Sequence, residues 1–342
     1  RDGAPVEPGL NTPLIEGDRF RTTNGRAELG LPRGAVIFLD RHSSIDLRTV
    51  NRLRLLAGRL RLASPGSAEP PDIVIDAPGA TLTPSSVTAF LLEASAGPRG
   101  DEVVLRVEEG VVEFSSDRDT LLVRAGESAS LRAGGTPTAV TGYTRAERSE
   151  FDIWVGERLR GYQPQATTAA ATSYLPDELG SYRATLEQYG SWGSEPEYGN
   201  VWYPSVAEDW RPYSSGYWDR VGAYGQFWIG YDPWAWPTHH YGRWGYRGRW
   251  FWAPGAVWAP AYVSWSVGPG YIGWSPLGFS VGFNTWGGSY YYGGSYYHDY
   301  WRGWNVLPAH RFYGRRYPYG RDYVDPRRLS HGTRSAFVTQ RY

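Results

Sequence analysis

Residues 197–218 read EYGNVWYPSVAEDWRPYSSGYW, and two later stretches repeat the pattern: YGQFWIGYDPWAWPTHHYGRW at 224–244 and RGRWFWAPGAVWAPAYVSW at 247–265. Each copy opens with a tryptophan or has one near its start, has a second eight residues later, and has a third after seven or eight more. A pattern that recurs about every 20–26 residues is typical of proteins built from stacked or blade-like units. We therefore expect a Trp/Tyr-rich β-repeat domain over residues 191–278.

These tryptophans have two interpretations, as the core of the repeat domain or as a binding surface. In a core, each indole would lie between strands and donate its N–H to a backbone carbonyl. On a surface, a row of rings would stack on the C–H faces of sugars, with polar side chains beside them. The candidate packing or binding residues are Trp202, Trp210, Trp218, Trp228, Trp234, Trp236, Trp244, Trp250, Trp252, Trp258 and Trp265, and the candidate polar neighbours are Asp209, Asp232, Arg243 and Arg249.

Two close pairs of tryptophans each predict one aromatic face on a strand. Trp234 and Trp236 are two residues apart, and so are Trp250 and Trp252. Because side chains alternate across a strand, the members of each pair would face the same side. One such side could be core while the opposite side binds a ligand.

The composition excludes several classes of protein. The formal net charge is zero, so no overall field attracts nucleic acid, and we expect no nucleic-acid partner. The chain has no cysteine and no methionine, and all 35 basic residues are arginine, which suits a life outside the cytoplasm. It has no run of about 18 apolar residues, so we expect no membrane span. We expect a secreted, periplasmic or cell-surface protein from which a signal peptide has been cleaved.

Residues 18–143 have the pattern of an all-β domain. Short alternating segments are separated by glycine turns at intervals of about 8–12 residues. The dipeptide Asn24-Gly25 predicts a tight hairpin, since both positions of that turn need positive φ. The segment LRLLAGRLRL at 53–62 is matched in pattern by LRVEEGVVEF at 105–114. Residues 1–17 are polar and rich in proline, and predict an extended arm that is disordered or donated to a neighbour.

Within this segment, four motifs resemble a FecR domain: FRTTNGRAEL at 20–29, LLAGR at 55–59, VEEGVV at 107–112 and RAGE at 124–127. The resemblance covers roughly residues 18–140. It implies a β domain of the kind found in the periplasmic, signal-receiving part of anti-sigma regulators.

Residues 144–190 predict a short helical connector. Phe151, Trp154, Val155 and Leu159 share one helix face, with Ser149 as the N-cap. A second helix is predicted around Leu179, Tyr182, Leu186 and Tyr189, ending at Gly190 as its C-cap. Between them, residues 163–173 are of low complexity and predict a linker. Residues 279–342 are rich in Gly, Tyr and Arg and predict an extended C-terminal arm.

The aromatic region resembles the Trp/Tyr-rich DUF6600 domain that follows FecR domains in secreted bacterial proteins. The segments YRATLEQYGSW at 182–192, PEYGNVW at 196–202 and HYGRW at 240–244 carry the resemblance, which spans about residues 174–278. It implies export and no established activity.

Nothing in the sequence fixes a reaction, and we expect neither an enzyme nor a cofactor. A glycosidase needs a pair of carboxyl groups, and the candidates among the aromatic residues are Glu195, Glu197, Glu208, Asp209, Asp219 and Asp232. His239 and His240 are adjacent and would point to opposite faces of a strand, so we expect no metal site.

The sequence thus predicts a mainly β protein with an N-terminal FecR-like domain, a helical connector, an aromatic repeat domain and a C-terminal arm. We expect an exported cell-envelope or extracellular protein, structural or adhesive, that assembles with itself or with envelope partners, for example as a filament or surface layer. The alternatives are a glycan- or peptidoglycan-binding module, with polysaccharide as its partner, and a FecR-type envelope signal sensor.

Overall fold

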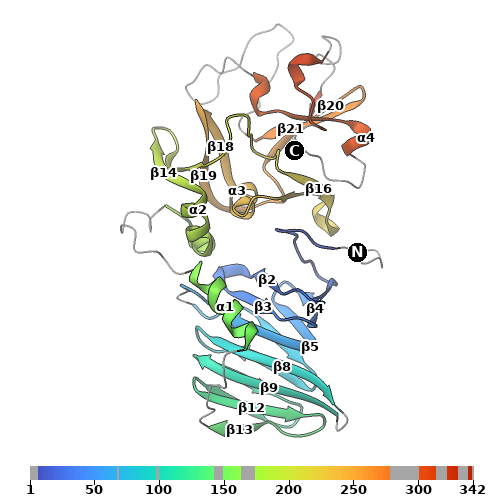
Figure 1. Cartoon of the computed structure of the whole chain (residues 1–342), viewed down its shortest axis with the longest axis vertical. Coiled ribbons are helices and arrows are strands. Elements are labelled where there is room, and N and C mark those ends of the chain that lie inside the picture. The colour runs from blue at the N-terminus through green and yellow to red at the C-terminus, as the bar shows by residue number, and fades with distance from the viewer. Residues whose placement is uncertain are drawn as a thin grey trace. The chain divides into compact units, whose positions relative to one another are not determined.

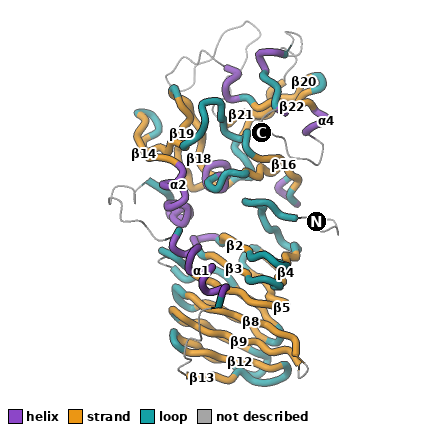
Figure 2. Tube along the Cα trace, viewed as in Figure 1, coloured by secondary structure: helices purple, strands orange, loops and turns teal. Residues whose placement is uncertain are grey.

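A computed structural model describes residues 7–67, 69–97, 100–141, 149–162, 174–277, 300–312, 322–329 and 338–340. The chain divides into an N-terminal unit, chiefly Pro13–Gln165, and a C-terminal unit, chiefly Thr185–Tyr342 (Figure 1). Strands make up 48% of the structure and helices 17%, which confirms a mainly β protein (Figure 2). None of the helices within the described ranges is both long and apolar enough to cross a membrane.

The N-terminal unit is a sandwich of two strand layers that share the long strand β5 (Arg52–Ala63). Both layers send alternate side chains into one core that includes Leu53, Leu60, Phe90 and Phe114. In order across the first layer lie β1 (Arg19–Arg21), β4 (Ser44–Thr49), β5, β6 (Val74–Ala77), β7 (Ala80–Pro84), β10 (Val111–Ser115) and β11 (Thr120–Arg124). Across the second lie β2 (Ala27–Gly30), β3 (Val36–Leu39), β5, β8 (Ala89–Gly97), β9 (Gly100–Glu109), β12 (Glu127–Arg132) and β13 (Thr138–Thr141).

Strand β5 passes from one layer to the other at Gly58. Leu53 and Leu55 before it, and Leu60 and Leu62 after it, are all buried in the same core. Side chains alternate along a strand, so odd and even positions share a face only if the register changes between them. Gly58 supplies that change, since its φ of +97° lies where side chains rarely go and a Cβ would approach Ser43 Cα to 2.5 Å.

The predicted likeness of 105–114 to 53–62 has a counterpart at Gly110, whose φ is +78°. The chain crosses there from β9 in the second layer to β10 in the first, and Leu105 and Phe114 both reach the core. The predicted hairpin at Asn24-Gly25 is wrong. Strand β1 pairs with β4 and β2 pairs with β3, so the dipeptide joins two layers instead of two paired strands.

The first predicted helix is confirmed as α1 (Glu150–Arg160). Ser149 caps it by accepting the Asp152 N–H, and the Asp152 carboxylate accepts the Ser149 N–H in return. Phe151 and Val155 pack on Val36 and Phe38, so α1 covers the outer face of the second layer. This second cover explains why all four residues of β3 are buried.

The second predicted helix is split into a 3-10 turn (Asp177–Tyr182) and α2 (Arg183–Tyr189). Gly190 is not its C-cap, since it begins strand β14 (Gly190–Glu195). A Cβ on Gly190 would lie 2.4 Å from the Trp202 ring, so glycine is needed there for close packing. The predicted linker at 163–173 lies outside the described residues.

The C-terminal unit consists of three small antiparallel sheets with short helices. One sheet has the order β14-β15-β19-β18, the second pairs β16 with β17, and the third has the order β22-β21-β20-β23. The elements are β15 (Gly199–Pro204), β16 (Gly216–Arg220), β17 (Gln226–Gly230), α3 (Ala235–His240), β18 (Tyr241–Arg247), β19 (Arg249–Trp258), β20 (Val263–Gly268), β21 (Tyr271–Pro276), β22 (Asn305–Pro308), α4 (Ala309–Phe312) and β23 (Val338–Gln340).

The copies of the sequence repeat adopt different structures. Their first tryptophans all lie in strands, but the middle ones lie in a loop at Trp210, in α3 at Trp236 and at the end of β19 at Trp258. The sheets differ in size as well. The repeat therefore reflects recurring strands with indole side chains and does not produce identical stacked units.

Parts of both predicted arms are folded onto the C-terminal unit. The Asn11 side-chain amide donates to the carbonyls of Gly230 and Asp232, each at 3.0 Å. Within the predicted C-terminal arm, β22 and β23 complete the third sheet and Trp304 and Val306 are buried. These segments are thus ordered contacts of the chain with itself, and not extended chain.

Candidate functional site

The aromatic side chains of the C-terminal unit form its core. Trp192, Trp202, Trp252 and Trp244 are direct cross-strand partners in one row across the first sheet. Trp218 pairs with Trp228 in the second sheet, and Trp265 with Trp274 in the third. The rings meet mostly edge to face or tilted, at centroid distances such as 5.1 Å between Trp202 and Trp234, the geometry that aromatic pairs favour.

Burial favours the core interpretation for most of the predicted ring residues. Trp202, Trp228 and Trp252 are fully buried, and Trp234, Trp244 and Trp250 nearly so. Those that remain half-buried are Trp210, Trp218, Trp236, Trp258 and Trp265.

The expected arrangement of the two close tryptophan pairs is wrong in part. Trp234 and Trp236 lie at the start of α3 and not in a strand. Trp250 and Trp252 do lie in β19, but Phe251 between them is also buried, against Val201 and Tyr203. Strand β19 is therefore covered on both sides at this point and offers no open face.

Three indole N–H groups, those of Trp202, Trp252 and Trp274, donate to backbone carbonyls, as the core interpretation predicts. Trp202 Nε1 donates to Leu186 O at 2.8 Å, and Trp252 Nε1 donates to Tyr241 O at 2.7 Å. A buried donor without an acceptor would cost free energy, so these bonds stabilise the fold. Each of them also joins a strand to a neighbouring segment.

Tyr213 and His239 form the polar centre of this core. Tyr213 adopts a left-handed φ of 59°, and its N–H donates to His239 Nε2 at 3.2 Å. Its hydroxyl donates to His239 O at 2.9 Å and accepts the Tyr262 N–H at 3.0 Å, while its carbonyl accepts the Trp274 indole N–H. One tyrosine thereby joins α3, the segment before β20, and β21.

The two histidines are held neutral. His239 Nδ1 lies 3.1 Å from Ala235 O and His240 Nδ1 lies 3.0 Å from Ala259 O, so each ring donates through Nδ1 to a backbone carbonyl. Burial lowers the pKa of His239 to about 3 and that of His240 to about 4. The prediction that they lie in a strand is wrong, since both belong to α3.

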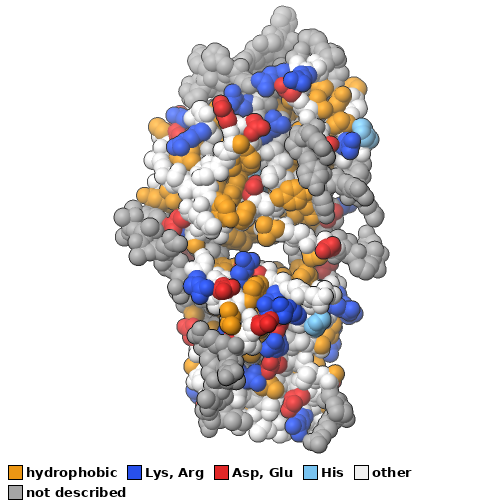
Figure 3. All heavy atoms as spheres, viewed as in Figure 1, with side chains coloured by type: hydrophobic (Ala, Val, Ile, Leu, Met, Phe, Trp, Pro, Cys, Tyr) orange, Lys and Arg blue, Asp and Glu red, His pale blue; other side chains and the backbone are white. Residues whose placement is uncertain are grey.

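His240 and Phe227 form the base of a partly exposed group of rings, Tyr224, Trp236 and Trp258, which we call the rim cluster. His240 lies 4.6 Å from Trp236 and 6.2 Å from Trp258, and Trp258 lies 5.1 Å from Tyr224. Tyr224 is 51% exposed and both tryptophans are half-buried. Figure 3 shows hydrophobic side chains gathered on the visible face of the C-terminal unit.

The predicted polar neighbours do not converge on one point. Arg249 stacks on the Tyr203 ring at 3.6 Å from its centroid. Arg243 is exposed, and its charge opposes the effect of burial on the pKa of Tyr262. Asp209 is exposed. Burial raises the pKa of Asp232, and hydrogen bonds with Ser215 and Trp210 partly offset this rise.

Three of the six carboxylates considered for a glycosidase, Glu195, Glu197 and Asp219, make other contacts. Glu195 and Glu197 both lie 3.4 Å from the Arg247 guanidinium, and Glu195 also accepts the Tyr203 hydroxyl at 2.6 Å. Asp219 accepts the Arg220 N–H. A guanidinium between two carboxylates offsets part of their charge and braces the hairpin that carries them.

Sequence reasoning missed Tyr213, Phe227 and the role of the histidine pair. The ring partners of Phe227 and His239 lie in other elements of the chain, so the local spacing of residues could not predict these contacts. The sequence did contain one sign that the histidines are buried, since His239 and His240 lie in the middle of the aromatic segment WPTHHYG at 236–242. Such residues are buried when their ring nitrogens find backbone partners.

Comparisons with known proteins support part of the expected resemblance. Residues 183–281 match a family described as "Family of unknown function (DUF6600)". No curated protein matches the chain. Two crystal structures of a "putative anti-sigma factor" from Parabacteroides distasonis ATCC 8503 align with 55% of the chain and with 100% and 99% of their own, at 12% and 11% identity and TM-scores of 0.31 and 0.30. The FecR resemblance of residues 18–140 stays a prediction.

Proposed function

We propose that this is an exported, non-catalytic protein of the bacterial cell envelope or surface, structural or adhesive in role. It would hold a second copy of itself, or a neighbouring envelope protein, through the rim cluster of its C-terminal unit. Export and the absence of catalysis belong to the proposal, and the composition and the resemblance to secreted proteins motivate them.

The observation that carries this proposal is the half-exposed state of the rim cluster. Tyr224 is 51% exposed and Trp236 and Trp258 are half-buried, whereas the neighbouring core tryptophans Trp228, Trp234 and Trp252 are buried. Tyr and Trp dominate the binding energy of protein interfaces, because a large rigid ring buries much area and loses little entropy. A ring that is packed along one edge and exposed along the other is rigid in this sense and has area left for a partner.

The base beneath the rim cluster makes it rigid. Phe227 is fully buried and contacts Trp236 and Trp258 at 6.1 and 6.0 Å, and His240 is fixed by its bond to Ala259 O. A preformed surface loses little conformational entropy when a partner binds. This favours a holding role for the cluster over one that requires it to rearrange.

Self-association can be tested with Tyr224→Asp, which places a charge on the exposed edge of the cluster. The matched control is Tyr198→Asp, since Tyr198 is 40% exposed in the same unit but packs on Phe251 instead. Sedimentation of the full chain should show oligomers that Tyr224→Asp weakens by about tenfold or more and that Tyr198→Asp leaves unchanged. A monomer at every concentration, with no binding of envelope proteins, would contradict the proposal.

A second candidate function is glycan binding, which the same cluster favours because three rings of two types lie together at the surface. Neutral cell-wall polysaccharides should then quench tryptophan emission, and Trp258→Ala should remove the quenching. If no glycan changes the emission, this candidate is excluded while self-association stays open.

A further inference from the structure

The outer face of the first layer in the N-terminal unit carries a row of charged and polar side chains that runs across six strands. Arg19 on β1, Asp46 on β4, Arg54 on β5, Asp76 on β6 and Thr81 on β7 are successive cross-strand partners, and Ser115 on β10 follows. Cross-strand partners on one face lie about 5 Å apart at Cβ, so opposite charges alternate side by side.

The two acids of this row, Asp46 and Asp76, are paired with Arg19 and Arg52. The Asp46 carboxylate lies 2.7 Å from Arg19 Nε, and the Asp76 carboxylate accepts two bonds of 2.8 Å from Arg52. The hydrogen bonds from Arg52 lower the pKa of Asp76, so it stays charged and paired at neutral pH. Within the described ranges no hydrogen bond or ion pair holds the Arg54 guanidinium.

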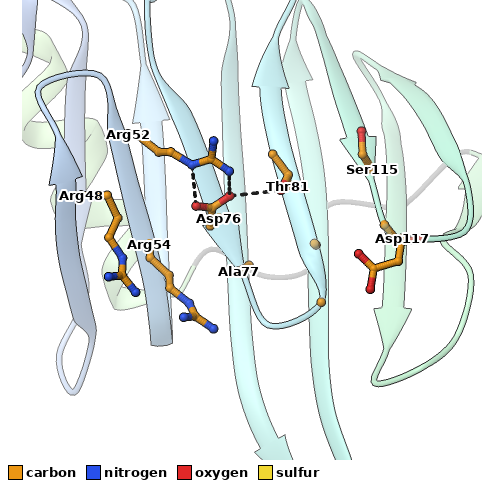
Figure 4. A pocket seen from close by; sticks show the side chains of 11 residues that line it. Arg48, Arg52, Arg54, Asp76, Ala77, Thr81, Ser115 and Asp117 are labelled. Carbon is orange, nitrogen blue, oxygen red and sulfur yellow. Dashed lines mark hydrogen bonds and ion pairs between the residues drawn. The ribbon is translucent and has the colours of Figure 1, made fainter.

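Arg48 adds a second weakly engaged cation. Its guanidinium lies 4.0 Å from Asp46, at the limit of an ion pair, and the side chain is 51% exposed. In Figure 4, Arg48 and Arg54 extend in the same direction along neighbouring strands. Among the described residues, Arg54 lies beside Asp46 and Asp76 without a hydrogen bond to either, and Arg48 reaches Asp46 only at 4.0 Å, so both guanidinium groups keep N–H donors for a ligand.

These side chains line a hollow of about 560 Å³. The arginines form one side, the tight turn that follows Ala77 lies in the middle, and Ser115 and Asp117 form the other side (Figure 4). This volume is within the usual range for small-ligand sites, about 300–1000 Å³.

We propose that this hollow binds an acidic saccharide, with the sugar carboxylate on Arg48 and Arg54 and the sugar hydroxyls on Asp117 and Ser115. Guanidinium groups bind carboxylates through paired charge-assisted hydrogen bonds. The carboxylate of Asp117, to which no described residue donates a side-chain hydrogen bond, accepts hydrogen bonds from hydroxyls but repels a bare anion. A ligand with one carboxylate and several hydroxyls satisfies both sides, whereas a phosphate satisfies only one.

The test uses calorimetry on the full chain with three probes: a galacturonic acid trimer, the uncharged galactose trimer and tripolyphosphate. The galacturonic acid trimer should bind, more weakly at high salt, and the double variant Arg48→Ala/Arg54→Ala should lower its affinity by about tenfold or more. The matched control is Arg124→Ala, an exposed arginine of β11 outside the hollow, which should leave binding unchanged.

Asp117→Asn separates a saccharide site from a site for any anion. It should weaken binding of the galacturonic acid trimer, because the amide accepts hydroxyls less well than a carboxylate does, and it should not weaken binding of tripolyphosphate. No binding of the acidic trimer, equal binding of the uncharged trimer, or tighter binding of tripolyphosphate would each overturn the proposal. The hollow and the rim cluster lie in different units, so loss of one activity leaves the other measurable.

Discussion

Tyr213 shows how a single side chain can hold several segments of an aromatic core. Its side chain is fully buried, and its hydroxyl donates to the His239 carbonyl while it accepts the Tyr262 N–H. Burial accordingly raises the pKa of the phenol well above its usual range. Removal of such a hydroxyl leaves two buried partners without a bond, and this costs more than the bonds contribute when made.

We therefore expect Tyr213→Phe to lower the free energy of unfolding of the C-terminal unit by about 2–4 kcal/mol. Urea unfolding followed by tryptophan emission measures this, since all but one of the 17 tryptophans lie at residues 192–304. Tyr224→Phe, at an exposed tyrosine, should change it by less than about 0.5 kcal/mol. Equal effects of the two variants would contradict the role assigned to Tyr213.

The neutral histidines predict sensitivity to acid. In the unfolded chain a histidine has a pKa of about 6.5, whereas folding lowers the values to about 3 for His239 and about 4 for His240. Below pH 6.5 the unfolded state therefore binds protons that the folded state does not. The stability from these groups is complete above pH 6.5 and is lost as the pH falls toward 4.

Each histidine should contribute a loss of about 1.4 kcal/mol per pH unit in this window. Tryptophan emission during an acid titration should report unfolding of the C-terminal unit between about pH 6 and 4. Substitution of His240 by Asn, which keeps a donor for Ala259 O, should reduce the pH dependence even where it lowers stability at pH 7. An unchanged pH dependence would count against burial as its cause.

At the scale of the element, strand β5 depends on Gly58. Alanine there would be forced into a left-handed backbone and would clash with Ser43 Cα. Gly126 separates these two effects, because its φ is +84° while no atom lies within 4 Å of a Cβ built on it. Both glycines lie where the chain passes between layers of the sandwich.

We expect Gly126→Ala to cost about 1 kcal/mol from backbone strain alone, and Gly58→Ala to cost several times more. Thermal unfolding followed by circular dichroism of the N-terminal unit distinguishes them. If the two variants were equally stable, the close approach of β5 to Ser43 would not constrain the strand.

Helix α1 is an element that local sequence determines well. Its capping box, its apolar face and its ends all agree, and its position is secured by Arg61, which is buried between Glu108 and Asp152 at 2.5 and 3.0 Å. Cap and period are properties of adjacent residues, so they can be predicted without the fold. Arg61 could not be predicted as its anchor, because its partners lie 47 and 91 residues away.

At the scale of the whole molecule, the C-terminal unit includes a segment from the start of the chain. Residues 7–12 belong to it, whereas Pro13–Gln165 belong to the N-terminal unit. Asn11 is suited to this contact because its φ of 59° is tolerated by asparagine and its amide supplies both donors.

Asn11→Asp keeps the backbone preference but cannot donate to the two carbonyls. We expect faster hydrogen exchange and faster proteolysis around residues 7–12, with the unfolding of both units unchanged. Thr12→Val, which removes only a local bond to Gly9, serves as the control. Protection that is the same in Asn11→Asp as in the unmodified protein would show that the contact does not hold the segment.

The sequence by itself determined the mainly β class and the capped helix, and it left open whether the indoles are core or surface. The two features that it determined depend on alternation and spacing, both of which are local. The tertiary structure alone decided that Asn24-Gly25 joins two layers, that Trp234 to His240 form a helix, and that the arms fold back. It also decided which rings stay exposed and where Arg54 meets Asp46 and Asp76, because cross-strand neighbours are chosen by long-range pairing and not by adjacency in the chain.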